Sequence, residues 1–242
     1  MISRRAMFTL SFISALMVVP VQGAKDVELL EAIQKLKDAG SYTWRTESLI
    51  TPGSATPVVT EGWHNVAQGL YVKVTSEKHT VELAARSGVV VASTGEEWRP
   101  VKKFTRSDLD HSMIRSLADL KLPHLELAQV QDAWTPSRKN TADFFEGEVG
   151  LKAAPKILGI LTRQAGNPLD GFSISQSNAT ITLSGGLPLR WVLESRLSSP
   201  HGLLSSRQGA KMVLLTQFSN IGSTTVNMPA AAEAAIIAVK TR

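Results

Sequence analysis

Residues 41–50 (SYTWRTESLI) decide the fold, because their side chains alternate in character along the chain. On an extended chain Tyr42, Trp44, Thr46 and Ser48 would share one face, and Arg45 would lie with Glu47 on the other. A period of two is typical of a β-strand with one buried face. The segment therefore predicts a strand whose apolar side packs against another layer.

The same alternation recurs along most of the sequence, with turn residues every eight to twelve positions. This spacing favours an antiparallel meander. The segment Asp143–Val149 fits either a strand or an extended linker. The further predicted strands are Val58–Val66, Gly69–Ser76, His79–Arg86, Val89–Ser93, Trp98–Phe104, Phe172–Leu183, Leu187–Leu197 and Lys211–Ile221.

Helical patterns stand before, between and after the strands. The first runs over Asp26–Asp38, with Asp26 as its N-cap, an apolar stripe at 3.6-residue spacing, and Gly40 as its stop. The other predicted helices are Asp108–Leu120, Pro123 to about Ala133, Leu151–Gln164, and Pro229 to about Val239. Strands, then helices, then strands predict an α+β fold in which helices inserted between two strand blocks cover an antiparallel sheet.

The N-terminus has the pattern of an export signal. Met1 to Arg5 is basic, Ala6 to Val21 is apolar, and cleavage is expected after Gly23. We therefore predict a signal peptide over 1–23 and a single α+β domain over 24–242, in the periplasm or secreted from a bacterium. A retained membrane anchor is the alternative, and the two arginines leave both general and twin-arginine export open. After cleavage no stable membrane insertion is expected.

Composition excludes several further classes. The chain of 242 residues has no cysteine, which excludes a lipidated cysteine, disulfides and thiolate metal sites. Its formal charge of +5 falls to +3 once Arg4 and Arg5 leave with the signal peptide. The remaining basic residues are scattered, whereas a nucleic-acid surface needs them clustered. We expect a soluble protein with no nucleic-acid partner.

No established catalytic or cofactor motif is present, so we predict no enzyme activity, no cofactor and no metal site. The five histidines do not form a pair at i, i+4 on one predicted helix. The one enzymatic reading left open is an acid–base pair in which His111 or His124 lies beside Asp108, Asp110 or Asp119. It requires a cleft that brings these side chains together.

The strands have one face that is much more apolar than the other, and an antiparallel sheet must cover such a face. If the helices cover it loosely, the space between becomes an apolar ligand cavity; if they pack tightly, it is an ordinary core. Periodicity alone leaves both readings open. The predicted cavity-lining residues are Trp44, Leu70, Val72, Leu83, Trp191 and Leu193.

Three short motifs resemble the LolA/LppX-like fold of periplasmic lipoprotein carriers: the strand opening at Ser41–Trp44, the hairpin Gly185–Trp191 and the ending Phe218–Pro229. The resemblance implies a strongly curved antiparallel sheet, an incomplete barrel, with helices in its open side. It also implies binding of acyl chains or lipidated proteins. Arg45 is the nearest match to the ligand-gating arginine of the carriers.

Two functional hypotheses follow. The first is a periplasmic binding or carrier protein for a hydrophobic ligand, either lipid-like or the acyl chain of a lipoprotein, without catalysis. The second is a structural or protein-interaction module of the cell envelope with a solid core. The presence or absence of an internal cavity separates them.

Overall fold

The structure is a computed structural model that describes residues 22–51, 56–77, 79–95, 97–105, 114, 117–118, 120–137, 140–152, 154, 173–198 and 210–241. The apolar part of the predicted signal peptide lies outside the described residues. So do most of the predicted helices Asp108–Leu120 and Leu151–Gln164.

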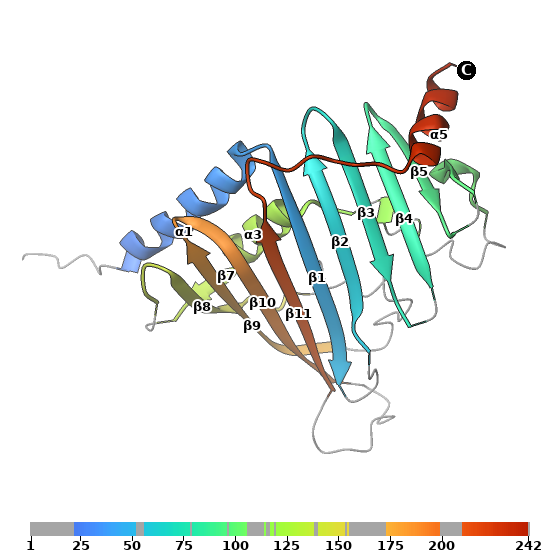
Figure 1. Ribbon diagram of the computed structural model, residues 1–242. Coiled ribbons are helices and arrows are strands. Elements are labelled where there is room, and N and C mark those ends of the chain that lie inside the picture. The colour runs from blue at the N-terminus through green and yellow to red at the C-terminus, as the bar shows by residue number, and fades with distance from the viewer. Residues whose placement is uncertain are drawn as a thin grey trace, which may run out of the picture.

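Eleven strands form one antiparallel sheet, in the order β6-β5-β4-β3-β2-β1-β11-β10-β9-β8-β7 (Figure 1). The first and last long strands, β1 and β11, pair at its centre, with Trp44 opposite Phe218. The strands are β1 (Ser41–Thr51), β2 (Val58–Asn65), β3 (Gly69–Thr75), β4 (Thr80–Arg86), β5 (Val89–Ser93), β6 (Arg99–Pro100), β7 (Trp134–Pro136), β8 (Phe144–Val149), β9 (Ser173–Ser184), β10 (Leu187–Ser198) and β11 (Ala210–Ser219).

The sheet confirms the predicted strands, most of them within two residues at each end. Asp143–Val149 proves to be a strand. The structure differs from the prediction at both edges of the sheet. At one edge, Trp98–Phe104 holds only the two-residue strand β6, followed by a 3-10 turn, η1 (Val101–Lys103). At the other edge, the short strand β7 (Trp134–Pro136) is not among the predicted strands. Short edge strands expose few unpaired backbone groups.

The sheet is open and not strongly curled, which corrects the strongly curved, incomplete barrel expected from the resemblance. Strong curvature requires bulges or glycine kinks that bend the strands. Among the described pairs, register shifts occur only between β9 and β10, at Pro188/Arg190 and Arg196/Leu197. The other described ladders keep an unbroken register, so twist alone shapes them.

Two helices cover one face of the sheet, which we call the inner face. α1 (Gln22–Asp38) packs against β10 and against α3 (Pro123–Asp132), and Figure 1 shows α3 behind the sheet. α1 buries Leu29, Ile33 and Leu36 in one stripe, as its spacing predicts. Burial of this stripe supplies most of the stability of so short a helix.

The ends of α1 were predicted with unequal success. It stops where expected, because Gly40 adopts a φ of +66°, a conformation that glycine reaches without strain, and donates to the Lys37 carbonyl. Its start was wrong: α1 begins at Gln22, so Asp26 lies inside the helix instead of capping it. Ala24 and Lys25 are good helix formers, which lets the helix extend toward the N-terminus.

The opposite, outer face carries α5 (Ala230–Lys240), which packs on β4 and β5 through Ala232 and Ile236. The segment that leads to α5 crosses the ends of the central strands (Figure 1). There Gly222 N donates to the Ser41 carbonyl at 2.8 Å, and Asn65 Nδ2 donates to the Thr224 carbonyl at 2.9 Å.

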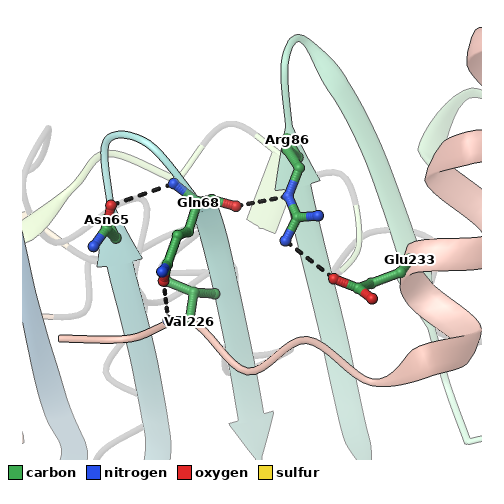
Figure 2. Close-up of polar contacts among 5 residues, drawn as sticks. All are labelled: Asn65, Gln68, Arg86, Val226 and Glu233. Carbon is green, nitrogen blue, oxygen red and sulfur yellow. Dashed lines mark hydrogen bonds and ion pairs between the residues drawn. The ribbon is translucent and has the colours of Figure 1, made fainter.

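Figure 2 shows how the same segment and α5 are tied to the sheet. Val226 N donates to Gln68 Oε1 at 2.7 Å. Arg86 Nε donates to the Gln68 carbonyl at 2.7 Å, while Arg86 Nη2 pairs with Glu233 Oε1 of α5 at 3.1 Å. Gln68 thus joins the β2–β3 turn both to the C-terminal segment and, through Arg86, to α5.

Among the described helices, none is long and apolar enough to span a membrane.

Candidate functional site

The six residues predicted to line a cavity all lie on the inner face. Five of them are buried members of the main core cluster, and Leu70 packs against it partly buried. Val72, Trp191 and Leu193 have no accessible surface. A side chain beside an empty, water-sized cavity keeps some accessible surface toward it, so these three contact other atoms all round.

Arg45 lies on the outer face, opposite the six, as the alternation in residues 41–50 predicts. Its Nε donates to Glu47 at 3.0 Å and its Nη1 to Glu61 at 2.8 Å. The hydrogen bond with Glu47, and then that with Glu61, raises the pKa of Arg45 above its ordinary value. The sheet therefore separates Arg45 from the space that it was expected to gate.

An aromatic cluster lies where α3 meets the inner face of β1 and β2. Tyr42 has Trp44, His64, His124 and Phe218 as ring neighbours, with centroid distances of 5.3–5.8 Å. Tyr42 Oη and His124 Nδ1 share a buried hydrogen bond of 2.7 Å. Burial, then repulsion by His64 and Lys37, lowers the pKa of His124 to about 4. His124 is thus neutral near pH 7 and acts as a structural partner of Tyr42.

Glu126 of α3 is a buried carboxyl group that forms no ion pair with a cation of the described residues. It is 3% exposed, and burial raises its pKa to about 8, an effect that Lys121 only partly opposes. At pH 7 the neutral acid therefore predominates, and a neutral carboxyl group offers both a hydrogen-bond donor and acceptors. From the sequence alone, Glu126 would be placed on a solvated helix face, because a glutamate is rarely buried.

In the part of the chain that the structure describes, four buried polar atoms against the inner face have no hydrogen-bond partner: His64 Nδ1, Glu126 Oε1, Trp134 Nε1 and Trp191 Nε1. They come from β2, α3, β7 and β10, so the set extends across both halves of the sheet. The great majority of buried polar side-chain atoms in native structures are hydrogen-bonded. The sequence pattern identified Trp191 only as an apolar residue and did not single out the other three. The spacing of residues along the chain does not show which hydrogen-bond partners a buried side chain will have.

The histidine–aspartate pair considered for acid–base catalysis involves residues largely outside the described part of the chain. Asp108, Asp110, His111 and Asp119 are among them. The described candidate, His124, contacts Tyr42 and His64, and no hydrogen bond joins it to a carboxylate of the described residues. Among the described residues, no three His, Asp or Glu side chains group closely enough to hold a metal ion.

Searches by sequence give no match, either to a family model or to a curated protein. Solved structures that match over most of their length include lipoprotein LppX from Mycobacterium tuberculosis, at 12% identity and a TM-score of 0.43, covering 86% of this chain and 99% of that one. LprF from Mycobacterium bovis matches at 11% identity and a TM-score of 0.46, covering 87% and 98%.

A LolA superfamily protein from Nitrosomonas europaea matches at 9% identity and a TM-score of 0.29, covering 85% of this chain and 94% of that one. These matches and the resemblance drawn from the sequence motifs name the same fold family.

Proposed function

We propose that this chain is an exported bacterial carrier that holds a hydrophobic ligand between the inner face of its sheet and helices α1 and α3, without catalysis. The N-terminal pattern supports export to the periplasm or the exterior. The observation that carries the proposal is the set of unpartnered buried polar atoms on the inner face, with Glu126 Oε1, Trp134 Nε1 and Trp191 Nε1 among them.

A bound ligand explains why such atoms persist. Leaving one buried donor or acceptor unsatisfied costs about 1–3 kcal/mol. An acyl chain would pack against the apolar inner face, while its ester or amide carbonyl would accept from an indole N–H or from the neutral Glu126 carboxyl. The ligand would then recover hydrogen bonds that the unliganded protein lacks.

Binding of this kind requires the helices to move. Trp191 and Leu193 of β10 are fully covered and α1 packs on β10, so a ligand reaches them only when α1 lifts from the sheet. The covering residues Leu29 and Leu36 of α1 are themselves apolar, and an acyl chain would replace their contacts with contacts of the same kind.

The complete burial of Val72, Trp191 and Leu193 also favours a second candidate function. If α1 and α3 stay in place, the core is solid, and the chain would serve as a structural or interaction module of the envelope. In that case its contacts with partners would come from the outer face and the loops.

Native mass spectrometry of the purified protein, together with lipid extraction, tests the proposal. We expect a co-purified lipid, or saturable binding of a fluorescent fatty acid. Trp191→Phe and Trp134→Phe remove the inner-face indole N–H groups but keep an aromatic ring, and each should weaken binding. Trp98→Phe, in the cluster beneath α5, is the matched control and should bind like the wild type. Absence of both bound lipid and fatty-acid binding would leave the interaction module as the better account.

A further inference from the structure

The outer face has a groove of about 610 Å³ over the central strands β2, β1 and β11 and the start of β10. Ligand pockets in proteins span about 300–1,000 Å³, so the groove is large enough for a small ligand. It lies on the opposite side of the sheet from the proposed hydrophobic site, and the inference drawn from it does not depend on that site.

The groove exists because small side chains stand between large ones on neighbouring strands. Thr43 of β1 lies opposite Ser219 of β11 on one side and opposite Trp63 of β2 on the other. Thr43 and Ser219 therefore form a low floor. Trp63 forms one wall, and Leu189, with 48% of its surface exposed, contributes to the lining from β10.

The Trp63 wall is held in place by its neighbour. Its ring stacks on Tyr71 at a centroid distance of 5.2 Å and an interplanar angle of 25°. The Tyr71 hydroxyl in turn donates to Glu82 on β4. One face of the indole is thus occupied by Tyr71, and the indole forms a flat wall beside the floor at Thr43.

The polar groups of the groove are largely arranged by contacts with one another. Thr43 Oγ1 and Ser219 Oγ lie 2.6 Å apart, and Asn220 Nδ2 donates to Thr43 Oγ1 at 3.3 Å. Along the next row Arg45 lies opposite both Glu61 and Gln217, and Arg190 lies opposite Gln217. Planar amide, carboxylate and guanidinium groups therefore line the groove beside its aromatic wall.

The charges of this region balance. Arg45 and Arg190 carry two positive charges, and the Arg45 partners Glu47 and Glu61 carry two negative ones. Arg190 is exposed, and among the described residues no carboxylate pairs with it. Glu47 is not among the residues that line the groove, so the lining itself carries one surplus positive charge, that of Arg190. A single surplus cation is far from the cluster of cations on which binding of a phosphate chain or a nucleic acid depends.

We propose that this groove binds a neutral saccharide chain. A pyranose ring has an apolar face of C–H groups that packs on a flat indole, and a rim of hydroxyls that donate and accept hydrogen bonds. Trp63 supplies the flat apolar surface. Glu61, Gln217 and the guanidinium of Arg190 supply donors and acceptors in one row, and Asn220 adds an amide beside Thr43. Arg190 can donate to sugar hydroxyls without an ionic partner.

Calorimetric titration of the full chain with tetrasaccharides of glucose and of N-acetylglucosamine tests this proposal. We expect saturable binding of at least one of them. Trp63→Ala should weaken binding about tenfold, the effect of losing one well-placed aromatic contact. Trp63→Phe keeps a flat ring and should retain most of the affinity, which distinguishes lost stacking from lost folding.

Arg190→Gln should also weaken binding, whereas Arg196→Gln, an exposed arginine farther along β10, is the matched control and should not. Circular dichroism confirms that each variant is folded. Three outcomes would overturn the proposal: no binding of either tetrasaccharide, equal binding by Trp63→Ala and wild type, or binding of polygalacturonate, an acidic glycan, in place of the neutral sugars.

Discussion

Polar side chains are hydrogen-bonded to different extents on the two faces of the sheet. On the outer face, Arg45 pairs with two glutamates and Thr43 with Ser219, so polar side chains satisfy one another at the surface. On the inner face, Glu126 and Trp191 each bury a polar atom that has no partner among the described residues. Under the proposed function, a ligand would supply the missing partners on the inner face, whereas the outer-face pairs named here need none.

Covering helices account for the difference. α1 and α3 exclude water from the inner face across β1 and β10, whereas α5 covers only β4 to β6 on the outer side. Water reaches the remainder of the outer face and satisfies any polar group that lacks a protein partner. An unpartnered atom should therefore cost more stability on the inner face than on the outer face, and the predictions below compare the two faces.

The largest contrast is expected between two tryptophans on opposite faces. Trp191→Ala should lower the free energy of unfolding by about 3–5 kcal/mol, because it leaves a cavity in the fully buried inner core. Trp63→Ala on the outer face should cost no more than about 2 kcal/mol, since the indole is only partly buried. Urea unfolding measures both values. Equal costs would show that the faces do not differ in packing.

Because of Glu126, the free energy of unfolding should fall as the pH rises. Its pKa is about 8 in the folded chain and 4.5 ordinarily, so the stabilising effect of its proton is complete below pH 4.5 and is lost as the pH rises through 8. The resulting slope is at most about 1.4 kcal/mol per pH unit. Glu126→Gln should remove this loss when unfolding is measured from pH 5 to 9.

The exposed Glu148→Gln is the control and should keep the wild-type pH profile. If Glu126→Gln declines with pH as the wild type does, the buried carboxyl group is not the source of the dependence.

His124 should lower the free energy of unfolding as the pH falls, over a narrower pH range than Glu126. Its pKa falls from 6.5 to about 4 on folding, so the unfolded chain takes up a proton more readily and the folded state loses stability as the pH drops from 6.5 to 4. His124→Asn should reduce this acid sensitivity in thermal melts. His79→Asn, at an exposed turn, serves as control; an unchanged acid limb in His124→Asn would contradict the assignment.

The smallest effects are expected at the ties in Figure 2. Gln68→Ala removes the acceptor of Val226 N and should cost about 1 kcal/mol. Glu233→Gln breaks a partly exposed ion pair with Arg86 and should cost about 0.5 kcal/mol. Hydrogen exchange of the α5 amides reports both changes. Unchanged exchange of the α5 amides in both variants would mean that these contacts do not anchor the outer helix.

Much of the fold could be predicted from the sequence because it follows from local periodicity. The alternation in residues 41–50 correctly placed Trp44 and Arg45 on opposite faces, and the Gly185-Gly186 turn fixed the β9–β10 hairpin. The pairing of β1 with β11 could not be derived this way, because its partners Thr43 and Ser219 lie 176 residues apart.

The sites depend on that long-range pairing and were therefore less predictable. The outer groove requires Thr43 and Ser219 side by side, a juxtaposition that no local pattern indicates. Glu126 was missed because a glutamate on a short helix is ordinarily solvated. The six predicted inner-face residues were brought together correctly, since apolar alternation is enough to place them on one face; their role in ligand binding stays a prediction.

The most direct test of the difference between the faces is the indole N–H spectrum of the five tryptophans by NMR, assigned with Trp→Phe variants. Addition of a long-chain acyl ester should shift the Trp134 and Trp191 signals, as their Nε1 groups gain acceptors, and leave Trp63 unchanged. A shift of Trp63 alone, or no shift at Trp134 and Trp191 while the ester binds, would contradict a ligand site on the inner face.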